Sequence, residues 1–284
     1  MRGRQGYALA LRRPSGHILT RSVARPGRGG RRWSHLPLLR GLAVLWEMLS
    51  VGAWALAYSA NAQTSQGDEE VPEPTGRMLW GTLGFALVFG LGLFFVLPLA
   101  ASSPLERLAG SSLAANLADG LLRLVLIVGY LWLIGRMAEI GRLFAYHGAE
   151  HRVINAFEAG AALTPAAVRP FPLTHPRCGT GFILVIAALA IAVFPLLGSP
   201  PWPVRLAERI LLLPLIAAAA YELLRLAARG YERRWVRRLV APALALQRLT
   251  TREPDDAQVE VAIAALERVL AEERAAADPA PARA

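Results

Sequence analysis

The chain has 284 residues, enough for one or two soluble domains, but its composition excludes an ordinary soluble protein. Apolar residues make up 54% of the sequence and charged residues only 18%, against about 25% charged in soluble domains. The net charge of +10 comes entirely from residues 1–40, which hold ten arginines and no acid. The 21 arginines of residues 41–284 balance the 21 acids.

Residues 1–35 form a basic arm that we place in the cytoplasm. Within it, Tyr7–Arg13 and His17–Arg21 alternate apolar and polar residues around the turn signal Pro14-Ser15-Gly16, which predicts a small β-hairpin. Such an arm can bind nucleic acid, but in a membrane protein it favours anionic lipid headgroups. We therefore expect the lipid bilayer as partner and no nucleic acid.

Four apolar stretches predict transmembrane helices. Two carry no charge, Leu79–Ala101 and Phe182–Gly198, and as helices they would be about 34 and 26 Å long, against a hydrocarbon layer of about 30 Å. The other two, Ala118–Gly135 and Arg209–Leu226, carry charges near their ends, and we expect these side chains to reach the interface. The charged residues are Asp119, Arg123, Glu222 and Arg225.

A fifth apolar segment, Leu36–Ala60, fits either a further span or a helix in the interface. If it lies in the interface and the N-terminus is cytoplasmic, the arginine-rich residues 136–180 and 227–254 also fall inside. A fifth span would instead put an arginine-rich terminus on the wrong side of the membrane. We therefore predict an all-α polytopic protein of the inner (cytoplasmic) membrane, with about four transmembrane helices in two hairpins and both termini cytoplasmic.

The membrane domain is expected to span residues 36–249 and to end in a basic amphipathic helix over Tyr231–Leu249, lying along the membrane. Residues 250–284 are expected to form a cytoplasmic helix and tail. Pro254, Asp255 and Asp256 are suited to a helix start, and a helical apolar stripe follows before an Ala/Pro/Glu-rich end. The stripe consists of Val259, Ile263, Leu266 and Leu270.

Chemistry-bearing residues gather in the loop 142–180, between the second and third spans. His147 and His151 are four residues apart, so on a helix both imidazoles face one ion. Glu150 completes an H-x-x-E-H pattern, in which the glutamate acts as general base on water beside a zinc ion. We expect this helix to end at Gly160. The same pattern also fits a solvated interfacial helix.

A second pair, His175 and Cys178, has the short H-x-x-C ligand spacing in a Pro-constrained loop. Cys178 alone would fit a buried small hydrophobe, but two His/Cys pairs in a chain nearly free of both residues favour a metal site. Arg177, between them, is a candidate anion clamp. Glu222, an acid inside an apolar stretch, is a candidate further ligand or imidazole partner, or else pairs with an arginine such as Arg142 or Arg225.

The motifs resemble those of the YqhQ family (domain of unknown function 1385). The resemblance rests on Tyr146-His147-Gly148-Ala149-Glu150-His151, Ile154-Asn155-Ala156-Phe157-Glu158-Ala159-Gly160, His175-Pro176-Arg177-Cys178-Gly179-Thr180, Leu36-Pro37-Leu38-Leu39-Arg40-Gly41 and Thr250-Thr251-Arg252-Glu253-Pro254. The family comprises bacterial membrane proteins described as metal-dependent enzymes without a settled reaction, so the resemblance implies a membrane location and a metal site. Its members usually begin with a Gly-Gly-Gln-Ala-type segment and a Met-Met-Arg-Gly stretch, of which Met1-Arg2-Gly3 matches only the end.

Two hypotheses follow for the site. In the first, the chain is a metal-dependent hydrolase with a cytoplasm-facing zinc-type divalent ion on His147 and His151, completed by His175 or Cys178, with Glu150 as base. In the second, all four residues coordinate the ion, so the site is closed and pins the loop of a non-catalytic membrane scaffold.

Overall fold

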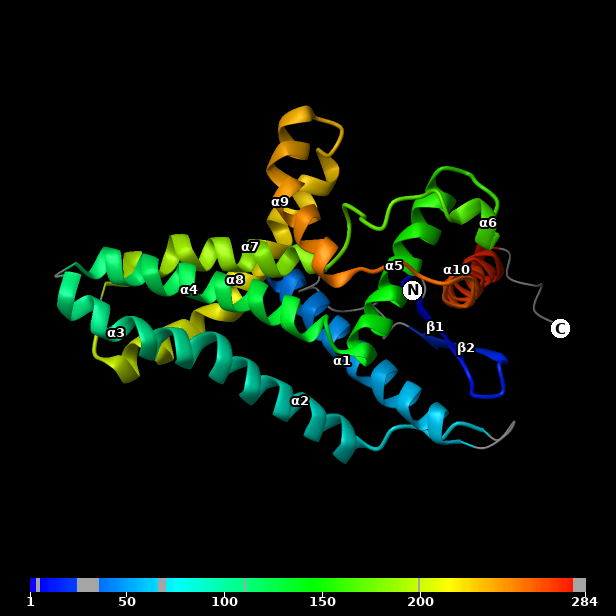
Figure 1. Cartoon of the computed structure of the whole chain (residues 1–284), viewed down its shortest axis with the longest axis horizontal. Helices are drawn as coiled ribbons and strands as arrows, with labels where there is room; N and C mark the ends of the chain where they lie inside the picture. The colour runs from blue at the N-terminus through cyan, green and yellow to red at the C-terminus, as the bar shows by residue number, and fades with distance from the viewer. Residues whose placement is uncertain (4–5, 25–35, 66–69, 110, 199, 278–284) are drawn as a thin grey trace.

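The computed structural model describes residues 1–3, 6–24, 36–65, 70–109, 111–198 and 200–277. Long helices run side by side through most of the molecule, and a smaller part, made of α5 (Ala138–Glu158), α6 (Pro165–Val168), α10 (Asp256–Ala277) and the two strands, lies at one end (Figure 1). The sequence hypotheses for residues 25–35 of the basic arm and for the tail 278–284 lie outside the described residues.

Among the described residues, five helical stretches are long and apolar enough to cross a membrane. Each of the four predicted spans falls in one of them, to within a residue at its ends. The five stretches are α1 (Leu39–Thr64); the continuous run of α2 (Gly76–Leu91), the π-helix η2 (Gly92–Val96) and α3 (Leu97–Ala109); α4 (Ser112–Ile134); α7 (Thr180–Val193) with the 3₁₀ turn η3 (Phe194–Leu197); and α8 (Trp202–Arg229). The chain is therefore a multi-pass membrane protein.

Helix α1 is the segment that the sequence left open between span and interface. It has the lowest mean hydropathy of the five candidates, 1.4, against 2.6 for Thr180–Leu197. It packs against α8, where a Cβ at Gly41 would lie 3.2 Å from the backbone of Ala218. Length and composition admit α1 as a fifth span beside the four predicted ones.

The charges of α4 do not reach the interface, and this part of the sequence prediction was wrong. Asp119 is 1% exposed and Arg123 is 3% exposed, because both side chains turn into the helix bundle, where Asp119 pairs with Arg123 and with Arg209 of α8. A long-range ion partner can hold a charge inside apolar helices, and a sequence window along one helix does not show it.

The predicted β-hairpin is confirmed. Strands β1 (Gly6–Arg12) and β2 (Ile18–Ala24) pair antiparallel with Arg12 opposite Ile18. Gly16 makes the turn with φ = +88°, a left-handed conformation that glycine adopts without steric cost. The hairpin packs on α10 and, through Leu11, on Tyr58 and Ala62 of α1.

The helix carrying the His pair is α5, and it ends as predicted, with Gly160 at φ = +71°. It packs on α10, and their shared core joins Val153 of α5 to the predicted apolar stripe of α10. Helix α10 begins with a reciprocal cap: the Gln258 amide donates to Asp255 Oδ1 (2.7 Å), and the Asp255 amide donates to Gln258 Oε1 (3.0 Å).

The amphipathic helix predicted after the last span is α9 (Arg234–Thr250), which projects sideways from the long helices (Figure 1). Its C-terminal end reaches the loop that carries the second His/Cys pair. There Gln247, 1% exposed, accepts a hydrogen bond from the amide of His175 and donates one to its carbonyl, both at 2.9 Å. The loop is thereby fixed against α9.

Candidate metal centre

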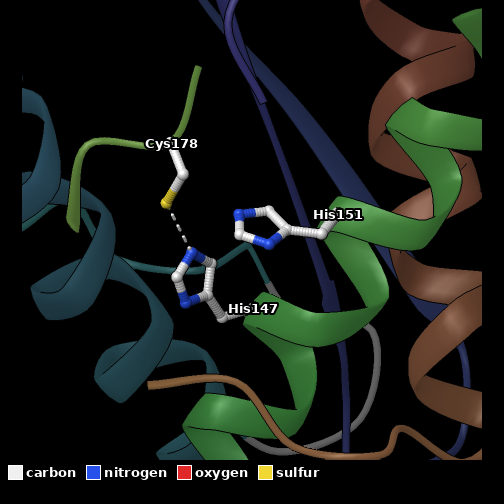
Figure 2. Close-up of side chains that lie close together, drawn as sticks. All are labelled: His147, His151 and Cys178. Carbon is white, nitrogen blue, oxygen red and sulfur yellow. Dashed lines mark hydrogen bonds between the residues drawn. The ribbon is translucent and has the colours of Figure 1, made fainter. Parts of the chain in front are cut away.

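Three side chains from the two predicted pairs converge: His147, His151 and Cys178 (Figure 2). One possible ligand atom from each lies within 4.8 Å of the other two. The histidines come from successive turns of α5, with ring centroids 4.3 Å apart, and the cysteine comes from the loop just before α7. As predicted, the i, i+4 spacing places both imidazoles on one face of α5, and the H-x-x-C loop supplies the third donor.

Both imidazoles are oriented by backbone carbonyls. His147 Nδ1 donates to the carbonyl of Thr250 (2.9 Å), and His151 Nδ1 donates to the carbonyl of Leu173 (2.6 Å). A carbonyl only accepts hydrogen bonds, so the proton of each neutral ring stays on Nδ1 and the lone pair stays on Nε2. Histidines that bind metal are held in this way by a second interaction on the other ring nitrogen.

Cys178 is set up as a thiolate. Its Sγ lies 3.2 Å from His147 Nε2 and 3.2 Å from Thr180 Oγ1, and it accepts a hydrogen bond from the Thr180 amide at 3.5 Å. Burial raises the pKa of Cys178, but hydrogen bonds from His147, His151 and Thr180 outweigh burial and lower the pKa to about 5. The thiolate is the form that binds metal.

The pKa of His147 is shifted upward, opposite to that of Cys178. Burial lowers the pKa of His147, but the contact with Cys178, the hydrogen bond to Thr250 and the charge of Glu150 together raise it by more, so the net pKa lies above its usual value. Both shifts favour the charged forms, an imidazolium on His147 and a thiolate on Cys178. A divalent cation can replace the shared proton, because the same two atoms are ligands once that proton leaves.

His175 lies next to the three-residue group, with its ring centroid 6.1 Å from that of His151 and its side chain 6% exposed. Its Nε2 points to Glu158 at 3.5 Å, and its Nδ1 accepts from the Arg177 amide at 3.3 Å. Burial lowers the pKa of His175, and Glu158 offsets this only in part. The lowered pKa favours the neutral form of His175, and both of its ring nitrogens have protein partners.

The remaining candidates lie farther out. Glu150 lines a cavity of about 280 Å³ together with residues of the hairpin and α1, among them Tyr7 and Trp54. The guanidinium of Arg177 is largely exposed and pairs with Glu158 at 2.8 Å. The structure brings neither side chain into the three-donor group.

The carboxylate of Glu222 pairs with an arginine that the sequence analysis did not name as a partner. Both of its carboxylate oxygens accept hydrogen bonds from Arg40 of α1, one of them from Nε at 2.6 Å. This pair, rather than one with the expected Arg142 or Arg225, ties α8 to α1.

Sequence reasoning missed Gln247, Thr250 and Leu173, which position the ligands. Thr250 and Leu173 act through backbone carbonyls, which carry no side-chain signal, and Gln247 is an ordinary polar residue in an amphipathic helix. Gly148, inside the His motif, did carry a signal. A Cβ there would lie 2.2 Å from the carbonyl oxygen of Arg252, so the chain after α9 passes α5 too closely for a side chain.

Comparisons with known proteins identify the family of the chain. Residues 36–272 match the family model described as "Protein of unknown function (DUF1385)", and the chain belongs to this family. It is 28% identical over 279 residues to the "Uncharacterized protein YqhQ" of Bacillus subtilis (strain 168), covering 94% of this chain and 88% of that protein. No solved structure matches the chain.

Proposed function

We propose that the chain is a membrane-embedded, metal-dependent hydrolase, with a cytoplasm-facing zinc-type ion held by His147, His151 and Cys178. The observation that carries the proposal is the convergence of three donors, two of them with the Nδ1–H already fixed on a carbonyl. Two imidazole nitrogens and a thiolate suit zinc in chemistry. Three protein ligands leave a coordination position for water, as in catalytic zinc sites.

When bound, such an ion makes water acidic enough to serve as a nucleophile near neutral pH. The protein must then supply a proton acceptor. Glu150 is our first choice because it precedes His151 in the H-x-x-E-H pattern, and its charge contributes to the raised pKa of His147. His175 is the other candidate, since its ring centroid lies 6.1 Å from that of His151 and its Nε2 lies 3.5 Å from Glu158. At the rim, Arg177 would leave Glu158 to bind an anionic group of the substrate.

A structural site in a membrane scaffold is the second candidate. It is favoured by one observation: His175 is a buried neutral imidazole beside His151. If His175 turned from Glu158 to the ion, four ligands would close the tetrahedron and leave no position for water.

Cobalt substitution separates the two candidates. The purified protein would be loaded with Co²⁺, and its visible spectrum recorded with and without azide, which occupies an open coordination position. The hydrolase proposal predicts that azide shifts the bands. An unchanged spectrum would favour the closed site, and His175→Ala should then open it.

Substitutions test the ligands and the base. His151→Ala and Cys178→Ser should each lose stoichiometric zinc by elemental analysis, whereas Glu139→Gln, at the other end of α5, should keep it. Glu150→Gln should keep the metal and fail to complement a deletion strain at matched protein level. Full complementation by Glu150→Gln would remove Glu150 as base, and unchanged zinc in His151→Ala would refute the site.

The membrane orientation belongs to the same proposal. We infer that both termini and the metal centre face the cytoplasm and that the arginine-rich arm contacts anionic lipid headgroups. The support is the arginine asymmetry between the two sides of the spans, since positively charged loops stay inside.

A further inference from the structure

A second cluster of charges lies inside the transmembrane helices, away from the metal centre. Asp119 Oδ2 of α4 accepts a hydrogen bond from Arg123 (3.0 Å), and the same oxygen forms an ion pair with Arg209 of α8 (2.7 Å). Arg209 also donates to Asn116 Oδ1 at 2.9 Å. Arg123 stacks on Phe194, about 20 Å along α7 from Thr180, where the metal loop ends.

This cluster has one positive charge in excess, because two guanidinium groups share one carboxylate and arginine does not lose its proton. The side chains of Asp119, Arg123 and Arg209 are all at least 96% buried. An ionised group among transmembrane helices is costly unless it is paired, and such groups commonly mark binding sites.

Arg123 has two unused donors. Its Nε and Nη1 are buried and have no hydrogen-bond partner in the described part of the chain, whereas Arg209 Nη1, which also lacks a hydrogen bond, lies 2.7 Å from the Asp119 carboxylate. The faces of the Arg123 guanidinium lie against Phe95 and Phe194, with its Cζ 4.5 and 5.1 Å from the ring centroids. Aromatic rings hold the group in place but leave its N–H edge unsatisfied.

Arg123 also lines a cavity of about 240 Å³ whose other lining residues are apolar or aromatic. The π-helix η2 contributes Phe94 and Phe95, and π-helical turns often lie at functional sites. The remaining walls come from α4, α7 and α8. One lining residue, Ile183, is 37% exposed, so the cavity reaches the outer surface of the bundle, where lipid chains lie.

We propose that this cavity binds a single-chain anionic amphiphile, with its carboxylate or phosphate head on Arg123 and its hydrocarbon chain along the apolar walls. An oxyanion supplies the negative charge that the cluster lacks, and it would accept the two unused N–H groups in a charge-assisted pair once the Arg123 guanidinium turns its N–H edge toward the cavity. A neutral lipid would leave both N–H groups of Arg123 unsatisfied. The site shares no residue with the metal centre and is independent of the proposed hydrolase activity.

The test is equilibrium binding of three labelled probes, dodecanoate, dodecyl phosphate and dodecanol, to the full chain in nanodiscs of neutral phosphatidylcholine, with empty nanodiscs subtracted. Saturable binding is expected for at least one anion and not for dodecanol. Arg123→Met should weaken anion binding at least tenfold. It leaves the balanced pair of Asp119 and Arg209, so the bundle should still assemble. Arg136→Met, which removes an exposed arginine stacked on Trp132, should bind like the wild type.

Ile183→Trp provides a second variant if Arg123→Met fails to assemble. It narrows the cavity from its exposed edge without touching the charges, and it should also abolish saturable binding. Equal anion binding by the wild type and either variant, or equal saturable binding of dodecanol and the anions, would overturn the proposal. His151→Ala should bind the anion normally, which separates this result from any failure of the metal site.

Discussion

The close passage of the chain over Gly148 allows a sharp test of how the metal centre is held. In Gly148→Ala the new Cβ would meet the carbonyl oxygen of Arg252 at 2.2 Å, and that segment cannot retreat freely. The Arg252 amide donates to the carbonyl of Phe144 at 3.0 Å, and the nearby Thr250 carbonyl accepts from His147. The substitution must therefore break backbone contacts that orient a ligand.

The expected magnitude follows from these contacts. Overpacking against backbone costs up to about 3 kcal/mol, and each of the two hydrogen bonds contributes about 1 kcal/mol. Alanine returns about 1 kcal/mol through its higher helix propensity, which leaves a net loss of roughly 3–4 kcal/mol in the free energy of unfolding. Loss of the carbonyl that orients His147 should also lower metal affinity about 10- to 100-fold.

Two measurements check this prediction: thermal unfolding in detergent and competition for zinc with a chromogenic chelator. Gly129→Ala is the matched control, because Gly129 lies in a helix with nothing within 4 Å of an added Cβ. It should melt at or slightly above the wild-type temperature and bind zinc equally. Wild-type melting and zinc affinity in Gly148→Ala would show that the segment after α9 does not hold His147 as described.

Three further predictions follow. Topology reporters fused after residue 160 and at the C-terminus should both report the cytoplasm. A reporter fused near Gly110, outside the described residues, should report the exterior, and a cytoplasmic signal there would refute the four-span orientation. The pKa of about 5 for Cys178 means that the thiolate forms as the pH rises through 5, so iodoacetamide should react half-maximally near pH 5 in metal-free protein; a midpoint of pH 8–9 would contradict the imidazolium–thiolate pair. Asp255→Ala removes the cap that Gln258 shares and should cost about 1 kcal/mol of unfolding free energy by chemical denaturation, with zinc content unchanged; a silent substitution would exclude this role.

Local patterns in the sequence were sufficient for the spans, the hairpin and the shared face of His147 and His151. Each depends on neighbours within a few residues: apolar length for a span, alternation around a glycine turn for the hairpin, and a spacing of four for the two imidazoles. These interactions join residues that are close in sequence, so composition and periodicity are enough to predict them.

The tertiary structure alone decided which polar groups meet. His147 depends on a carbonyl 103 residues away, and Glu222 pairs with Arg40 across 182 residues. Asp119 and Arg123 were expected to reach the interface, but both are buried in the bundle, where Asp119 pairs with Arg123 and with Arg209. Hydrogen bonds and ion pairs between distant segments depend on how helices pack, and a periodic pattern along one helix gives the face of a side chain but not the group it faces.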